Sequence, residues 1–180
     1  MAELHLIVGC MFSGKSSELL KIINNYNRLK IPVCVINHSL DKRYGENEIV
    51  SHDKKRYPSF QRDNLMGLKD TEIFKKSQGV FVEEGQFFND LVDFYNLCMN
   101  QDKKLYVAGL NGDFQQNPMG QISQLYSKCD SITKLNALCS VCLNEGKQTT
   151  AIFTKRVVDS KEVILVDSSE SYIPVCRKHL

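Results

Sequence analysis

The chain has 180 residues, a length that suits one domain, or one domain with a small lobe. Of these residues 42% are hydrophobic and 24% are charged, so a buried core can form. The formal net charge of +2 indicates no strong attraction to nucleic acid, and no apolar run approaches the length of a membrane span. Seven cysteines without a secretion signal favour thiol or metal chemistry over a disulfide framework, so we expect a cytoplasmic protein.

The first predicted strand, at 4–8, leads into Gly-Cys-Met-Phe-Ser-Gly-Lys-Ser at 9–16. This segment fits the phosphate-binding loop pattern G-x-x-x-x-G-K-[ST], and the strand before it and the helix after it supply the context that the pattern needs. Its glycines permit a turn whose N–H groups surround phosphate oxygens, next to the positive end of a helix dipole. The lysine offers charge to the β- and γ-phosphates, and the serine hydroxyl is a Mg²⁺ ligand. The predicted phosphate-binding residues are Gly9, Cys10, Met11, Phe12, Ser13, Gly14, Lys15 and Ser16.

Apolar residues at helical spacing from Leu19 to Leu29 predict the helix after this loop, and Pro32 ends it. A strand rich in β-branched residues follows at 33–36. The order strand, helix, strand is a βαβ unit, which indicates a parallel sheet with helices on its faces. Residues 38–63 lose this periodicity and carry many charges, which predicts a solvated surface loop. A loop there can reach bound phosphates, so its Arg43 is a candidate for stabilising charge on a transferred group.

A third buried strand, at 79–82, ends in Glu83 and Glu84. Open α/β sheets place their sites at the carboxyl ends of strands. One carboxylate there can hold Mg²⁺, and the other can accept a proton from an attacking hydroxyl. Side chains alternate along a strand, so a local turn must bring both towards the phosphates. The alternative is that Glu84 only complements the dipole of a helix predicted at 89–100.

The later part of the chain contains one more predicted core strand, at 105–110, and then two pairs of metal-ligand residues. The pairs have C-x-x-C and C-x-x-H spacing, and strands are predicted between them at 149–153 and 162–166. Thiolates and imidazole together suit tetrahedral Zn²⁺, which predicts a small zinc-bound β lobe. The alternatives are a redox C-x-x-C or two unrelated thiol pairs. The predicted zinc ligands are Cys139, Cys142, Cys176 and His179, whereas Cys34, Cys98 and Cys129 are interpreted as packed thiols.

Taken together, these motifs resemble the type II thymidine kinases, a family of cellular and poxviral enzymes with G-P-M-F-S-G-K-[ST] and D-E-G-Q-F-F motifs. The resemblance runs through 9–16, 84–88, 110–115 and 154–156 to the C-terminal cysteine and histidine. It implies a P-loop, RecA-like parallel sheet flanked by helices, with a small C-terminal zinc-binding β lobe. The expected units are a P-loop ATP-binding α/β domain at 1–136 and a zinc-binding lobe with a substrate lasso loop at 137–180.

The resemblance also implies roles by position. Glu84 corresponds to the catalytic base that takes the proton from a nucleoside 5′-hydroxyl, and Glu83, where the family has Asp, holds Mg²⁺ with Ser16. The further phosphate-binding residues implied are Asp41, Lys42, Arg43, Glu83, Gly85 and Gln86. The nucleoside-binding residues implied are Met11, Phe87, Leu110, Phe114, Val163, Ile164, Leu165, Val166, Asp167 and Tyr172. This chain departs from the family at Cys10 (usually Pro), at Asp167-Ser168 (often Gly-Gly) and at His179 (often Cys).

The function that the sequence favours is a thymidine kinase, which moves the γ-phosphate of ATP to the 5′-hydroxyl of thymidine, or of deoxyuridine, and yields dTMP for nucleotide salvage. Mg²⁺ would accompany ATP, and Zn²⁺ would be structural. The alternative is a P-loop ATPase or switch protein with a structural zinc site, in which Glu84 polarises water. A zinc-bearing nucleic-acid-binding module is disfavoured by the near-neutral charge. The resemblance further implies a homotetramer inhibited by dTTP, with no nucleic-acid or membrane partner.

Overall fold

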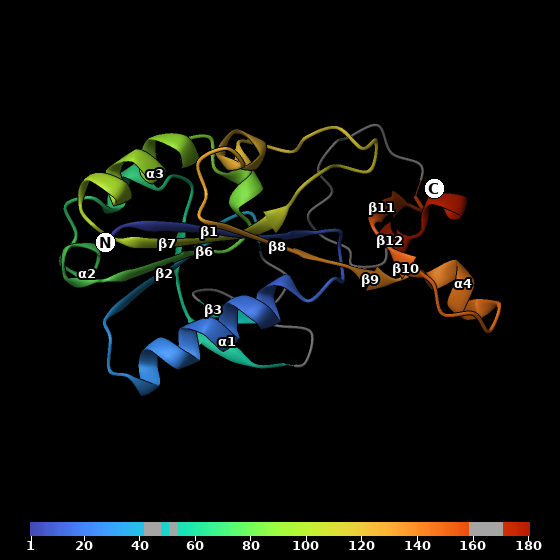
Figure 1. Ribbon diagram of the computed structural model, residues 1–180, viewed down its shortest axis with the longest axis horizontal. Coiled ribbons are helices and arrows are strands. Elements are labelled where there is room, and N and C mark those ends of the chain that lie inside the picture. The colour runs from blue at the N-terminus through green and yellow to red at the C-terminus, as the bar shows by residue number, and fades with distance from the viewer. Residues whose placement is uncertain (42–47, 51–53, 159–170) are drawn as a thin grey trace.

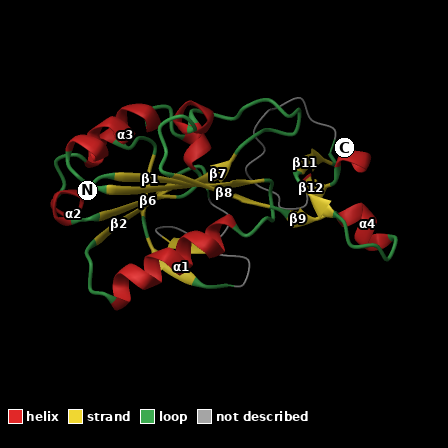
Figure 2. Cartoon of the chain, viewed as in Figure 1, coloured by secondary structure: helices red, strands yellow, loops and turns green. Residues whose placement is uncertain are grey.

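The structure analysed is a computed structural model, which describes residues 1–41, 48–50, 54–158 and 171–180. Its main body is a six-stranded sheet, and a smaller lobe of short strands lies beyond one end of that sheet (Figure 1). The helices α1 (Lys15–Arg28) and α3 (Leu91–Asn100) lie on opposite sides of the sheet (Figure 2). The predicted α/β class is therefore confirmed.

Every pairing within the main sheet is parallel, and the strand order is β5-β2-β6-β7-β1-β8. The strand that precedes the predicted phosphate loop lies between two strands from much later in the chain, so that Leu6 is in register with Val107 and with Ile132. Strands buried on both faces need continuous apolar runs, which is why the four central strands of this sheet are recognisable in the sequence. The strands are β1 (Glu3–Gly9), β2 (Val33–His38), β5 (Phe60–Arg62), β6 (Gly79–Val82), β7 (Lys104–Leu110) and β8 (Ser131–Leu135).

Two apolar clusters hold the helices against the two faces of the sheet. Helix α1 buries Leu19 and Ile23 in one cluster, together with Phe81 from β6. The other cluster contains Phe94 from α3 and Phe74 from the short helix α2 (Glu72–Lys76). The thiols of Cys34 and Cys98 lie in this second cluster, as predicted, and Cys129 packs against its edge. Within the described residues, no helix combines the length and the apolar character needed to cross a bilayer.

The prediction of a surface loop over 38–63 was wrong. This segment contains an antiparallel hairpin of β3 (Glu48–Val50) and β4 (Arg56–Pro58), and it then contributes β5 to the edge of the main sheet. Short edge strands tolerate charged residues because one of their sides faces water, so the hydrophobic pattern does not reveal them. Strand β8, at the opposite edge, was not predicted for the same reason. The predicted helix at 89–100 begins two residues later than expected, at Leu91.

In the described residues, the C-terminal lobe contains two antiparallel strand pairs and two helical turns around a small apolar cluster. The strand predicted at 149–153 is two strands separated by Ile152, and the strand predicted at 162–166 lies outside the described residues. The elements of the lobe are β9 (Ala137–Leu138), α4 (Ser140–Asn144), β10 (Thr150–Ala151), β11 (Phe153–Arg156), β12 (Tyr172–Val175) and the 3-10 helix η5 (Arg177–His179).

Candidate active site

The predicted phosphate loop connects β1 to α1 in a left-handed turn. Phe12 and Gly14 both have positive φ, at 63° and 85°. A side chain at Gly9 would place its Cβ 2.3 Å from the carbonyl oxygen of Leu135, so only glycine fits beside β8 there. The Lys15 Nζ donates a hydrogen bond to the carbonyl oxygen of Cys10 at 2.8 Å and so lies across the loop. This compact turn at a helix N-terminus has the form needed to bind phosphate.

A buried hydroxyl inside this loop lacks a protein partner. Among the described residues, the Oγ of Ser13 accepts and donates no hydrogen bond, although it is buried. A buried polar group normally has a partner, so this hydroxyl fits a site whose partner is a ligand oxygen. The donor set of the loop therefore fits a nucleotide phosphate.

The two predicted carboxylates at the end of β6 have different hydrogen-bond partners. Glu83 accepts a hydrogen bond from the Oγ of Ser16, the residue after the loop lysine. Glu84 has φ 54° and ψ 40°, a left-handed conformation that is uncommon for a residue with a side chain. This is the local turn that the alternation of side chains requires. A hydroxyl and a carboxylate side by side are oxygen ligands of the kind that Mg²⁺ prefers, so the residues present fit that ion.

Gln86 fixes the carboxylate of Glu84. Its Nε2 donates to the Oε2 of Glu84 at 2.5 Å, and its Oε1 accepts from the backbone N–H of Leu110 at 3.0 Å. Gly120 lies against the backbone of Gln86. A Cβ at position 120 would be 2.1 Å from the carbonyl oxygen of Gln86. The predicted phosphate contact of Gln86 stays a prediction, and its side-chain partners among the described residues are Glu84 and the backbone of Leu110.

The end of β2 brings two more polar residues towards this corner. Asp41 is buried, and its Oδ2 accepts from the side-chain amide of Asn37 at 3.1 Å. His38 packs against the rings of Phe87 and Phe88, with ring centroids 5.6 and 4.6 Å away. Burial lowers the pKa of His38 below its usual value, although nearby carboxylates act to raise it. The predicted Lys42 and Arg43 lie outside the described residues.

The residues predicted to bind a nucleoside come from several elements around the loop. The backbone N–H of Met11 donates to the Oγ1 of Thr154 on β11 at 3.0 Å, which attaches the loop to the C-terminal lobe. A cavity of about 790 Å³ lies beside them, between Phe12 and residues of β9, α4 and β12. Tyr172 lines this cavity, whereas the ring of Phe114 packs against the guanidinium of Arg156. The predicted Val163, Ile164, Leu165, Val166 and Asp167 lie outside the described residues.

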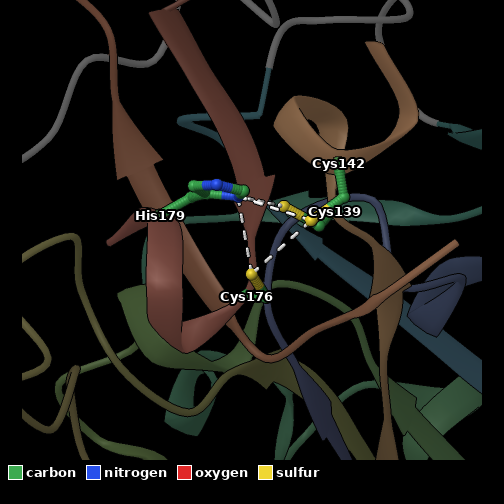
Figure 3. Close-up of side chains that lie close together, drawn as sticks. All are labelled: Cys139, Cys142, Cys176 and His179. Carbon is green, nitrogen blue, oxygen red and sulfur yellow. Dashed lines mark hydrogen bonds between the residues drawn. The ribbon is translucent and has the colours of Figure 1, made fainter. Parts of the chain in front are cut away.

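The four predicted metal ligands converge in the C-terminal lobe. Figure 3 shows Cys139, Cys142, Cys176 and His179 pointing towards one another, and their ligand atoms all lie within 4.8 Å of each other. The Nδ1 of the histidine is 3.4–3.6 Å from each sulfur. Burial acts to raise the pKa of Cys139, but hydrogen bonds from backbone amides and from the histidine lower it below its usual range, which favours the thiolate. Three thiols and an imidazole at these distances can bind a metal ion.

A carboxylate outside the cluster faces its histidine. The Oε1 of Glu145, just after α4, lies 3.9 Å from the Nε2 of His179, on the opposite side of the ring from the sulfurs. An outer carboxylate orients a metal-binding histidine once it accepts a hydrogen bond from the outer ring nitrogen, and Glu145 is within a short side-chain movement of that contact.

The sequence model described as "Thymidine kinase" matches residues 2–180 of this chain. The chain belongs to the thymidine kinase family. It is 38% identical to thymidine kinase 1 of Dictyostelium discoideum, over 97% of this chain and 76% of that protein. It is also 35% identical to the thymidine kinase of Yaba monkey tumor virus, over 97% of this chain and 92% of the relative. The thymidine kinase of Choristoneura fumiferana entomopoxvirus is 36% identical, over 97% and 94% respectively.

Three residues near the candidate active site of this thymidine kinase family member make contacts that the sequence did not predict. His38 was grouped with a charged surface segment, although it is buried against two rings beside Glu84. Thr154 and Arg156 were noted only as part of the family likeness, and their contacts with the loop and with Phe114 depend on the fold. The one signal available was their alternation along a short strand, which places both on the same face.

Proposed function

We propose that the protein is an ATP-dependent thymidine kinase, which transfers the γ-phosphate of ATP to the 5′-hydroxyl of thymidine and yields dTMP for nucleotide salvage. One observation carries the proposal: a buried carboxylate, Glu84, is fixed beside a phosphate loop by a left-handed turn and by a hydrogen bond from Gln86. Membership of the thymidine kinase family supports the same reaction.

The loop residues 9–16 would bind the triphosphate of ATP through backbone N–H groups, and the Lys15 ammonium would lie against the β- and γ-phosphates. Ser16 and Glu83 would hold Mg²⁺, which neutralises charge on the phosphates when it is bound. Asp41, Lys42 and Arg43 would complete the phosphate side of the site. Glu83 replaces the shorter Asp of related enzymes, and its contact with the hydroxyl of Ser16 supports a role at the metal.

Glu84 would act as the general base. Its carboxylate would accept the proton of the thymidine 5′-hydroxyl as the oxygen attacks the γ-phosphorus, while ADP leaves with the electrons of the broken bond. A residue with a side chain in the left-handed region costs about 1 kcal/mol or more. The strain at this position supports a functional requirement for a carboxylate where Gln86 can orient it.

The thymine would lie among Met11, Phe87, Leu110, Phe114 and Tyr172, covered by the segment 163–167. Aromatic walls suit a flat pyrimidine, since stacking contributes about 1–3 kcal/mol per base at other sites. Deoxyuridine lacks only a methyl group and would be a second substrate. Inhibition by dTTP would follow from the same pocket, because its base is identical and its triphosphate would extend to the phosphate loop.

The Cys₃His cluster would hold a structural Zn²⁺. Four protein ligands leave no open position for catalysis, and a tetrahedral ion suits this donor set. The ion would join β9 and α4 to β12 and η5, and so shape a lobe at 137–180 that is attached to the phosphate loop of the 1–136 domain by the Met11–Thr154 hydrogen bond.

A homotetramer in the cytoplasm is the proposed working form. Strand β8 lies at the edge of the sheet, and its residues 131–134 are exposed. An open, flat strand edge is a surface that proteins usually cover, which supports association between copies.

The decisive experiment is transfer of label from [γ-³²P]ATP to each of the four deoxynucleosides, with and without Mg²⁺. Thymidine should be phosphorylated in a ratio of one dTMP for each ADP formed, and the Lys15→Ala variant should be inactive. Release of inorganic phosphate without labelled nucleotide would refute the kinase and support the alternative P-loop ATPase.

A further inference from the structure

The guanidinium of Arg156 contacts two aromatic rings from different parts of the chain. Its Cζ is 3.9 Å from the ring centroid of Phe114 and 5.1 Å from that of Tyr172. Its Nη2 also donates a hydrogen bond to the Tyr172 hydroxyl at 2.5 Å. A planar guanidinium can stack on rings and donate in its own plane at the same time, which an ammonium group cannot do.

On each side of this contact the backbone is held by hydrogen bonds within its own element. Arg156 and Tyr172 are directly opposite each other in the antiparallel pair β11–β12, so their side chains share one face. Phe114 belongs to a tight turn in which the Oδ1 of Asp113 accepts from the backbone N–H groups of Gln115 and Asn117 at 2.8 and 2.9 Å. Arg156 therefore joins the strand pair β11–β12 to the turn that carries Phe114, which lies about forty residues earlier in the chain.

The same face of β11 adjoins the phosphate loop. Thr154 precedes Arg156 by two residues, so both side chains point to one side of the strand. The hydroxyl of Thr154 accepts from the N–H of Met11 in the loop. The turn that carries Phe114 begins just after Leu110, whose N–H is bound by the same Gln86 that orients Glu84. Arg156, Phe114 and Tyr172 are therefore connected to the phosphate loop through Thr154, and the turn that carries Phe114 is connected to Gln86 through Leu110.

We propose that Arg156 is a positioning residue of the nucleoside site, whose guanidinium fixes the ring of Phe114 and the ring of Tyr172 as walls of the base pocket. The inference rests on the proposed thymidine kinase activity and deepens it. Arg156 acts on the base pocket through the two rings, and it takes no part in the transfer of the phosphate.

The test measures KM and kcat separately for thymidine and for ATP in the Arg156→Met variant. Loss of the stacked, hydrogen-bonded guanidinium should raise the KM for thymidine about tenfold, while the KM for ATP stays close to the wild-type value. Arg156→Lys keeps the charge without the planar fork and should show a smaller rise. The Arg177→Met variant is the matched control, because the Cζ of Arg177 also covers a ring in this lobe, that of Phe153 at 4.9 Å. It should leave both KM values unchanged.

A double-mutant cycle separates positioning from a general effect on the fold. If Arg156 acts through the tyrosine hydroxyl, Arg156→Met combined with Tyr172→Phe should raise the KM for thymidine by much less than the product of the single effects. Metal content and melting temperature are measured for every variant. If Arg156→Met does not fold, Arg156→Lys and Tyr172→Phe carry the test.

An unchanged KM for thymidine in the folded variants would overturn the proposal, as would a fall in kcat with both KM values intact, which would place Arg156 at the transferred phosphate. An equal rise in both KM values would indicate a merely structural role and would also overturn it. Failure of the wild-type protein to phosphorylate thymidine would instead refute the proposed function.

Discussion

Replacement of Glu84 by glutamine tests the proposed chemistry most directly, because the structure indicates that it removes the base and little else. The side chain is 8% exposed, and its Oε2 accepts from the Nε2 of Gln86. A glutamine at position 84 can present its amide oxygen to the same donor, so the hydrogen bond and the left-handed turn are kept. The variant loses the capacity to accept a proton from the 5′-hydroxyl.

The size of the effect follows from the role. A positioned general base contributes about 10²–10⁴-fold to a rate, which corresponds to about 2.7–5.5 kcal/mol of activation free energy. We expect kcat for dTMP formation to fall by that factor. The KM for ATP should stay within about threefold of the wild-type value, because the phosphate loop is untouched.

The assay is steady-state conversion of labelled thymidine at saturating MgATP, with Glu72→Gln as the control. Glu72 lies on the exposed surface of α2, so its variant should match the wild type. A kcat for Glu84→Gln within about threefold of the wild type would refute the assignment of the base. A large rise in the KM for ATP at constant kcat would place Glu84 in the nucleotide site instead.

Three further predictions concern the metal cluster, a close backbone contact and pH. Cys142→Ala should lose bound zinc by elemental analysis and melt at a lower temperature, whereas Cys129→Ser should keep both properties; a wild type without zinc would refute the site. Gly120→Ala should reduce the free energy of unfolding by about 3 kcal/mol or more, because backbone strain adds to the steric overlap with Gln86. Gly146→Ala is the control: with φ 73° and no atom within 4 Å, it should reduce the free energy of unfolding by only about 1–2 kcal/mol. Equal losses for the two variants in urea titrations would contradict this. Burial lowers the pKa of His38 below 6.5, so at a pH just below 6.5 the unfolded chain binds a proton at this residue more readily than the folded chain does. The contribution of His38 to the free energy of unfolding is therefore fully present above pH 6.5 and declines below it. His38→Asn should flatten this decline between about pH 7.5 and 5.5, and an unchanged dependence of the free energy of unfolding on pH would refute the reasoning.

The parts of the fold that sequence analysis predicted are those encoded by local patterns. The loop at 9–16 and the strands at 33–36, 79–82 and 105–110 have apolar runs or glycine spacing that a buried parallel sheet requires. The edge strands β5 and β8 were missed because an edge needs no continuous apolar run. The strand order could not be predicted, since register between distant segments leaves no local signal.

The candidate site divides in the same way. Glu83, Glu84 and the metal ligands were identified because their chemistry demands particular residue types at fixed spacing. Gln86 was predicted to bind phosphate, and no sequence pattern indicated its hydrogen bonds to Glu84 and to the backbone of Leu110, 24 residues away. His38 was missed because one histidine within a charged segment does not reveal burial. Lys42, Arg43 and the lasso residues 163–167 remain predictions.

The place of β1 has a consequence for synthesis on the ribosome. Its partners are β7, which is complete only at Leu110, and β8, which is complete only at Leu135. Until the ribosome has made those segments, an apolar strand with two unpaired edges is present in the nascent chain. Non-local pairing of this kind is slow and exposes the chain to aggregation, so expression yield should depend on chaperone supply more than the modest size of the protein suggests.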